Sequence, residues 1–171
     1  SNIVASTDVS CNGGNNGSAT ATGSGGTGAI TYEWSANAGG QMTATATGLT
    51  ADIYTVTATD ANMCTAVESV TITEPSAMTI TSSVTSNYNG AQITCNGVCD
   101  GELTANAGLG TGAITYLWSA SANNQTTAIA TGICAGVHTV TATDANMCTI
   151  SSTVTITEPT AVTASIASSV S

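Results

Sequence analysis

Apolar and polar residues alternate along most of this chain with a period of two, which predicts β-strands. In Tyr54-Thr-Val-Thr-Ala58 the apolar side chains fall on one face and the threonines on the other, so one face should be buried. No window shows helical periodicity. In the first half we expect strands at 18–23, 29–35, 42–47, 53–59 and 66–73, separated by turns rich in Gly, Asn and Asp.

The same order of strands and turns occurs twice. Residues 11–75 and 95–159 align without a gap at an offset of 84, and 41 of the 65 paired positions are identical. Such self-similarity indicates tandem modules, and tandem modules usually serve reach, display or assembly rather than chemistry. Six or seven short strands per copy predict an all-β chain of two tandem immunoglobulin-like β-sandwiches.

Thr-Glu-Pro closes each copy, and proline cannot extend a central strand, so the module boundary belongs there. We assign module one to residues 1–76 and module two to residues 77–159. Residues 160–171 resemble the start of module two, which predicts the first strand of a further repeat or a linking strand. In an assembly, that strand could pair with the edge of another chain through Ala161, Val162, Ala164 and Ile166.

The charge balance excludes several partners. The chain has ten acidic residues and no Lys or Arg, so no basic surface is available for nucleic-acid phosphates. No apolar run approaches the ~20 residues that span a bilayer, so we expect no membrane insertion.

Six cysteines in a small acidic chain predict disulfides and an oxidising compartment. At the offset of 84, Cys11 corresponds to Cys95 and Cys64 to Cys148. Two further cysteines occur only in the second copy, and their joint presence is what a mutual bridge would produce. The predicted pairs are Cys11–Cys64, Cys95–Cys148 and Cys99–Cys134, each stabilising the fold by ~3–4 kcal/mol.

The motifs together resemble a known repeat. Their order is Cys-Asn-Gly, Gly-Thr-Gly, Tyr-x-Trp-Ser, Tyr-Thr-Val-Thr, Thr-Asp-Ala-Asn-x-Cys and Ile-Thr-Glu-Pro, and it resembles the SprB-type repeat of very large surface adhesins in gliding Bacteroidetes. The resemblance covers both modules and implies export to the bacterial cell surface through the type IX secretion system. Two departures are His138, where the family has Tyr, and Met63 and Met147, where it often has Gly.

Catalysis has few candidate groups, and we expect no enzyme. The single histidine, His138, occupies the position of Tyr54 in the other copy, so it should pack as a tyrosine substitute. A zinc site using Cys95, Cys99 and Cys134 with this histidine is an alternative, which an exported chain disfavours.

Calcium is the candidate metal, although the expectation is no cofactor. Asp60 with Asn62 recurs as Asp144 with Asn146 in identical turns, and calcium prefers such oxygen ligands. The competing interpretation is turn chemistry, in which Asp and Asn bind their own backbone.

Trp34 and Trp118 follow the inward alternation, which favours a core position over a glycan-stacking surface. The sequence therefore predicts an extracellular stalk or display module of a bacterial surface adhesin, with neighbouring repeats as partners. The alternatives are a subunit of a homo-oligomeric extracellular filament and a carbohydrate-binding accessory domain that binds a surface glycan.

Overall fold

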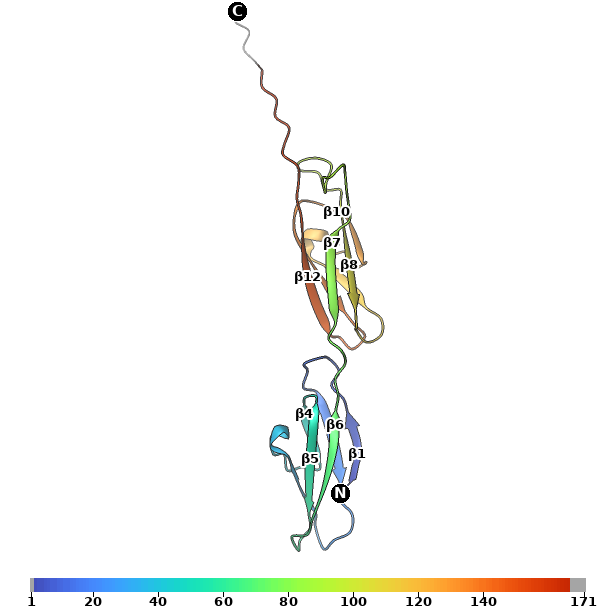
Figure 1. Cartoon of the computed structure of the whole chain (residues 1–171), viewed down its shortest axis with the longest axis vertical. Coiled ribbons are helices and arrows are strands. Elements are labelled where there is room, and N and C mark those ends of the chain that lie inside the picture. The colour runs from blue at the N-terminus through green and yellow to red at the C-terminus, as the bar shows by residue number, and fades with distance from the viewer. Residues whose placement is uncertain (1, 167–171) are drawn as a thin grey trace, which may run out of the picture. The chain divides into compact units, whose positions relative to one another are not determined.

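A computed structural model of the chain describes residues 2–166, and the chain divides into two compact units, residues 1–77 and 78–171. Each unit is an all-β sandwich of two three-stranded antiparallel sheets (Figure 1). The only helical segments among the described residues are two three-residue 3₁₀ turns, and no helix there is long and apolar enough to cross a membrane.

Module one pairs β1-β2-β4 in one sheet and β3-β5-β6 in the other. The 3₁₀ turn η1 (Ala36–Ala38) lies in the turn between the strands predicted at 29–35 and 42–47. The strands are β1 (Asn2–Thr7), β2 (Gly17–Thr22), β3 (Thr31–Trp34), β4 (Thr45–Leu49), β5 (Asp52–Thr59) and β6 (Thr65–Ile72).

Module two repeats this arrangement, with β7-β8-β10 in one sheet and β9-β11-β12 in the other. Its 3₁₀ turn is η2 (Ala120–Ala122). The strands are β7 (Thr79–Val84), β8 (Gly101–Gly108), β9 (Thr115–Trp118), β10 (Ile129–Ile133), β11 (Gly136–Thr143) and β12 (Thr149–Ile156).

The strand order is that of an immunoglobulin-like sandwich. The first, second and fourth strands of each module take the places of strands A, B and E, and the third, fifth and sixth take those of C, F and G. A buried Trp on the C-type strand and a buried side chain near the start of the F-type strand are further features of that fold. The predicted fold class is confirmed.

Each module has its own closely packed apolar core, in which alanine contributes several of the buried residues. In β5 the predicted inward residues are buried and the threonines between them are not, so the face assignment was right. The module-one core contains Val9, Ala19, Ala21, Trp34, Ala38, Ala46, Leu49, Tyr54, Val56 and Ile72.

One glycine per module is required by this close packing. A Cβ at Gly17 would lie 2.8 Å from Cγ2 of Ile72 and 2.8 Å from the Leu49 carbonyl oxygen. At the equivalent Gly101 a Cβ would lie 2.6 Å from Cδ1 of Ile156 and 2.8 Å from the Ile133 oxygen. The first residue of the B-type strand therefore has no room for a side chain.

The two ends of the described chain differ, and the interpretation of 160–171 as the first strand of a further repeat or a linking strand stays a prediction. Strand β1 pairs with β2 from Asn2 to Thr7 and so forms the first strand of module one. Residues 160–166 form no strand, because no neighbouring strand offers them hydrogen bonds within the described chain, and Val162 and Ile166 are exposed. Residues 167–171 lie outside the described part.

Candidate functional site

Many residues that the two modules share lie at the ends of each sandwich. We call the end where the first strand begins the upstream pole, and the end where the last strand finishes the downstream pole. In module one the upstream pole contains the loop 23–30 and the turn 60–64, and the downstream pole contains the turn 11–14 and residues 73–75. In module two the same poles contain 107–114 with 144–148, and 95–98 with 157–159.

The upstream pole of module one is organised by the Asp60 carboxylate. Its Oδ1 accepts hydrogen bonds from the N–H groups of Asn62 (2.9 Å) and Cys64 (2.8 Å), and its Oδ2 accepts one from Thr27 N–H (2.9 Å). One side chain thus closes the β5–β6 turn and attaches the preceding loop to it. Gly26 makes the approach possible, because a Cβ there would lie 2.8 Å from Asp60 Oδ2.

Module two repeats this arrangement with Asp144, which accepts from Asn146 N–H (2.9 Å), Cys148 N–H (2.9 Å) and Thr111 N–H (2.8 Å). The hydrogen bond from Thr111 is the largest cause that lowers the pKa of Asp144, as the one from Thr27 is for Asp60. Both carboxyls therefore have a pKa below the ordinary value, because donors stabilise the charged form.

These contacts support the turn-chemistry interpretation of Asp-Ala-Asn. Among the described residues, no group of three or more His, Cys, Asp or Glu side chains is placed to hold a metal ion. Asn62 and Asn146 take part in the turns through their backbone N–H groups. Calcium binding by Asp60, Asn62, Asp144 and Asn146 stays a prediction.

Met63 and Met147 lie in the same turns. Met63 has φ 64° and Met147 has φ 65°, both in the left-handed region where glycine is favoured. Both side chains are largely exposed, at 79% and 78%, so packing does not compensate for the backbone conformation. Glycine adopts this conformation without strain, which is a physical reason for the glycine that the SprB-type repeat often has at this position.

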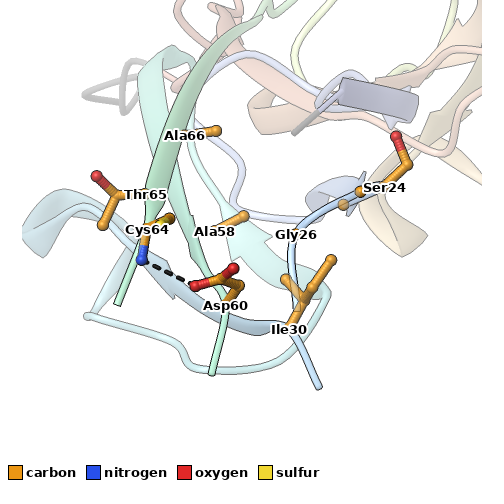
Figure 2. A pocket seen from close by; sticks show the side chains of 10 residues that line it. Ser24, Gly26, Ile30, Ala58, Asp60, Cys64, Thr65 and Ala66 are labelled. Carbon is orange, nitrogen blue, oxygen red and sulfur yellow. Dashed lines mark hydrogen bonds between the residues drawn. The ribbon is translucent and has the colours of Figure 1, made fainter. Parts of the chain in front are cut away.

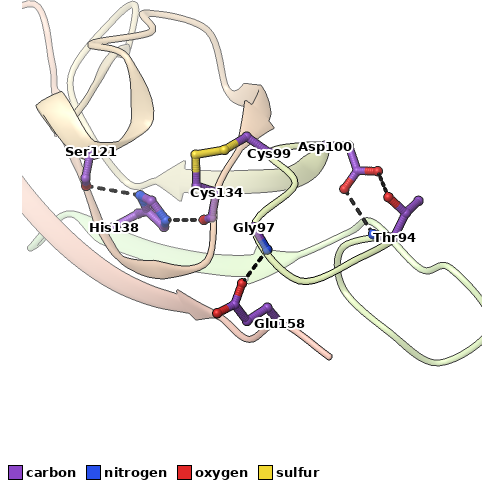
Figure 3. The surroundings of a disulfide bond; sticks show 8 residues. All are labelled: Thr94, Gly97, Cys99, Asp100, Ser121, Cys134, His138 and Glu158. Atoms are coloured by element: carbon purple, nitrogen blue, oxygen red, sulfur yellow. Dashed lines mark hydrogen bonds between the residues drawn. A yellow bond between two sulfur atoms is a disulfide. The ribbon is translucent and has the colours of Figure 1, made fainter. Parts of the chain in front are cut away.

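At the downstream pole the Glu of Thr-Glu-Pro binds the Cys-Asn-Gly turn. Glu74 accepts from Asn12 Nδ2 (3.0 Å) and from Gly13 N–H (2.6 Å). Glu158 accepts from Gly97 N–H at 2.8 Å in module two (Figure 3). Two motifs about 60 residues apart in sequence are therefore one structural unit that holds the end of the last strand.

A further pair at this pole escaped sequence analysis. Asp8 accepts from Thr73 N–H at 2.8 Å, and Gln92, at the same offset of 84, accepts from Thr157 N–H at 2.6 Å. The residues differ in type, so comparing identities does not find them; what they share is a side-chain oxygen. The Thr73 hydrogen bonds lower the pKa of Asp8.

Two of the three predicted disulfides are absent, since Cys64 and Cys95 are free, exposed thiols. The predicted bridges Cys11–Cys64 and Cys95–Cys148 were wrong because their members occupy opposite poles of one module. Strand β6 alone, with eight residues, separates the poles by about 27 Å at ~3.4 Å per residue. A disulfide requires Cα atoms within about 7 Å.

The third pair is present: Cys99 and Cys134 form a disulfide that joins the segment before β8 to the turn before β11 (Figure 3). Neither sulfur is available as a zinc thiolate. The same two segments approach each other in module one, where a Cβ at Gly48 would lie 4.0 Å from the Asn15 oxygen. The equivalent distance in module two, from Gly132 to the Cys99 oxygen, is also 4.0 Å.

His138 packs as the predicted tyrosine substitute. Tyr54 is 1% exposed and donates its hydroxyl to the Thr50 carbonyl oxygen at 3.0 Å. His138 is 2% exposed, and its Nε2 lies 3.0 Å from the equivalent carbonyl oxygen of Cys134. Because a carbonyl only accepts, Nε2 carries the proton, and in the neutral ring Nδ1 accepts from Ser121 Oγ at 3.0 Å.

Both tryptophans belong to the cores, at 1% exposure for Trp34 and 0% for Trp118. Each indole Nε1–H donates to a backbone carbonyl, of Thr43 at 3.0 Å and of Thr127 at 2.9 Å. Neither ring face is available for a sugar, so the core interpretation is the one that the packing supports.

The upstream pole of module one also contains a shallow pocket of about 140 Å³ (Figure 2). Glycines form much of its wall, with Asp60 and the Cys64 thiol at its side. It is lined by Gly23, Ser24, Gly25, Gly26, Ile30, Ala58, Asp60, Cys64, Thr65 and Ala66.

Comparison with known protein families gives one match: the family model described as SprB repeat matches residues 3–39. The matched segment includes β1, β2, β3 and the downstream-pole turn of module one. No curated protein matches the chain.

Proposed function

We propose that this chain, whose first module is a SprB-type repeat, is a segment of an extracellular bacterial surface adhesin in which the modules act as a stalk or display element. The mechanism is mechanical. Sandwiches in series hold an adhesive part at a distance from the cell, and each module contributes length and resistance to unfolding.

The proposal rests on where the amino-acid differences between the two modules lie. The turns 26–29 and 60–64 are identical to 110–113 and 144–148, whereas several exposed positions differ. Outward pairs that differ include Glu33 and Leu117, Met42 and Thr126, Ile53 and Val137, and Val67 and Ser151.

A binding or catalytic site present in every repeat would require the same exposed side chains in both modules. Apart from the outward threonines of β5 and β11, the modules share mainly the residues that fold a sandwich and shape its ends. This pattern favours a repeated structural unit over a repeated ligand site. The buried indoles likewise give the carbohydrate-binding alternative no stacking surface.

Single-molecule force spectroscopy on the full chain tests the mechanical role. We expect two separate unfolding events. Module two should extend by about 120 Å more after reduction, because the disulfide spans 35 residues at ~3.5 Å each. The matched control is the Cys99→Asn, Cys134→Thr double variant, which should give the longer extension without reductant. Extension of the chain without any resisted unfolding event would contradict a stalk function.

Surface exposure is tested on cells. Antibodies against the chain should label intact cells of the bacterium that produces it, with the same signal before and after permeabilisation. Labelling only after permeabilisation would contradict the extracellular location.

A glycan array with the purified chain tests the carbohydrate-binding alternative. That alternative requires specific binding of the chain to a glycan on the array.

A further inference from the structure

The two free thiols lie at opposite kinds of pole. Cys64 belongs to the upstream pole of module one, where its N–H donates to Asp60. The neighbouring loop of this pole follows Thr22, the residue of β2 that pairs with Asn2 of β1. Cys95 belongs to the downstream pole of module two, where it opens the turn closed by Val98 N–H to the Cys95 oxygen (3.1 Å).

Neither thiol can pair within its own module, and for Cys95 the nearby Cys99 and Cys134 are excluded because they are bonded to each other. The length of β6 or β12, eight residues each, separates the poles by about 27 Å. This distance exceeds the ~7 Å limit between Cα atoms of a disulfide roughly fourfold. A disulfide partner for either thiol must therefore come from outside its module.

The surroundings of the two thiols are complementary in shape. The turn 95–98 is exposed at every residue and has a glycine at its third position, so it is a narrow projection. Cys64 lies instead at the side of the glycine-walled pocket. A projecting turn that carries one thiol can thus approach a hollow that carries the other.

We propose that Cys95 of one molecule forms a disulfide with Cys64 of a second copy of the chain, joining a downstream pole to an upstream pole. The contact is heterologous, so each added copy presents a new free pole and the assembly is an open chain. Cys11 at the downstream pole of module one and Cys148 at the upstream pole of module two occupy the equivalent positions. Each module therefore has one of the four shared cysteines at each pole, as serial cross-linking requires.

The oxidation needs an acceptor for two electrons, and an extracellular disulfide such as oxidised glutathione supplies it. The Cys95 thiolate attacks one glutathione sulfur and releases one reduced glutathione. The Cys64 thiolate then attacks the Cys95 sulfur of this mixed disulfide and releases the second. One S–S bond forms between the chains, one breaks in the oxidant, and the two thiol protons end on the two glutathione thiols.

The test is a complementation experiment on the full chain. Wild-type protein in a glutathione redox buffer should give a ladder of multimers on non-reducing electrophoresis, which reductant collapses to monomer. Cys64→Ser and Cys95→Ser should each stay monomeric, and an equimolar mixture of the two should give dimers and nothing larger. The substitution Val67→Ala, at an exposed position of the adjoining strand β6 outside the pocket, is the matched control and should retain the ladder.

Isotope labelling identifies the bond. A mixture of ¹⁴N and ¹⁵N chains, digested with chymotrypsin because trypsin has no Lys or Arg to cleave, should give a Cys64–Cys95 peptide pair with one light and one heavy member. Pairs of equal label only, dimers of a single variant, or a monomeric wild type would each overturn the proposal. None of these outcomes affects the stalk function, because the unfolding events of a single chain do not depend on cross-links between copies.

Discussion

Modules one and two have the same strand order and nearly the same poles, yet different groups stabilise them. Module two has the Cys99–Cys134 disulfide and His138 at the start of its F-type strand. Module one has Asn15, Thr50 and Tyr54 at the equivalent positions. The backbone segments approach equally closely in both modules, so the disulfide is an addition to an existing contact and not the cause of it.

The modules also differ in how they use carboxylates. Module one has three aspartates with a lowered pKa: Asp8, Asp52 and Asp60. In module two only Asp144 has this property among the described residues. Gln92 and Gly136 occupy the other two positions. Module one thus has ionised carboxylates at positions where module two has the neutral residues Gln92 and Gly136. Module two has in addition a disulfide bond.

The largest expected effect comes from exchanging the disulfide between modules. Replacing Cys99 with Asn and Cys134 with Thr should destabilise module two by about 3–4 kcal/mol, because the bridge restricts a loop of 35 residues in the unfolded chain. Urea unfolding followed by the fluorescence of Trp118, in a Trp34→Phe background, reports on module two. An unchanged unfolding midpoint would mean that the disulfide contributes no stability.

The reciprocal exchange sharpens the same comparison. Asn15→Cys with Thr50→Cys should form a new bridge in module one, because Gly48 lies against Asn15 as Gly132 lies against Cys99. Its fluorescence reporter is Trp34, in a Trp118→Phe background. Failure of the new cysteines to pair would contradict the equivalence of the two backbones.

A smaller effect is expected at the Tyr54 and His138 positions. Tyr54→Phe should cost about 1 kcal/mol, since it removes the hydroxyl that pairs with the carbonyl oxygen and the side-chain oxygen of Thr50. His138→Phe should cost about 1–3 kcal/mol, because Ser121 and the Cys134 carbonyl both lose a buried partner. Unfolding free energies from the two Trp reporters give the values, and His138→Tyr is the conservative control. Equal costs for the two Phe variants would contradict the role of Ser121.

Acid should affect module one more than module two. Folding lowers the pKa of Asp8, Asp52 and Asp60, so these carboxyls stabilise the fold fully above the unfolded value of about 3.9. That stabilisation is lost as the pH falls through the lower folded-state pKa values. Melting temperatures between pH 5 and pH 2 should therefore fall more steeply for module one. Parallel curves for the two modules would show that the additional aspartates do not matter.

The smallest effect is a gain. Met63→Gly and Met147→Gly should each stabilise their module by about 0.5–1 kcal/mol, because glycine adopts the positive φ without strain. The gain should be equal in the two modules, whose turns have the same conformation. Thermal unfolding of both variants measures it, and Met→Ala, which keeps a Cβ, is the control that should show no such gain.

Local sequence determined much of this protein. Alternation placed Tyr54, Val56 and Ala58 inward and the tryptophans in the cores, because a strand turns every second side chain to the same face. Internal repetition identified the tandem modules, and the joint presence of Cys99 and Cys134 indicated the bridge that the structure contains.

Only the tertiary structure decided which side chains meet at the poles, because those contacts depend on which strand ends lie together. Sequence spacing does not reveal that Cys11 and Cys64 lie at opposite poles, since that follows from the direction of β6 across the module. It also does not show that Asp8 and Gln92 bind equivalent backbone groups. Local patterns depend on the chemistry of neighbouring residues, whereas the partners of a side chain at a pole depend on how distant strands pair, and that pairing is a property of the folded sandwich.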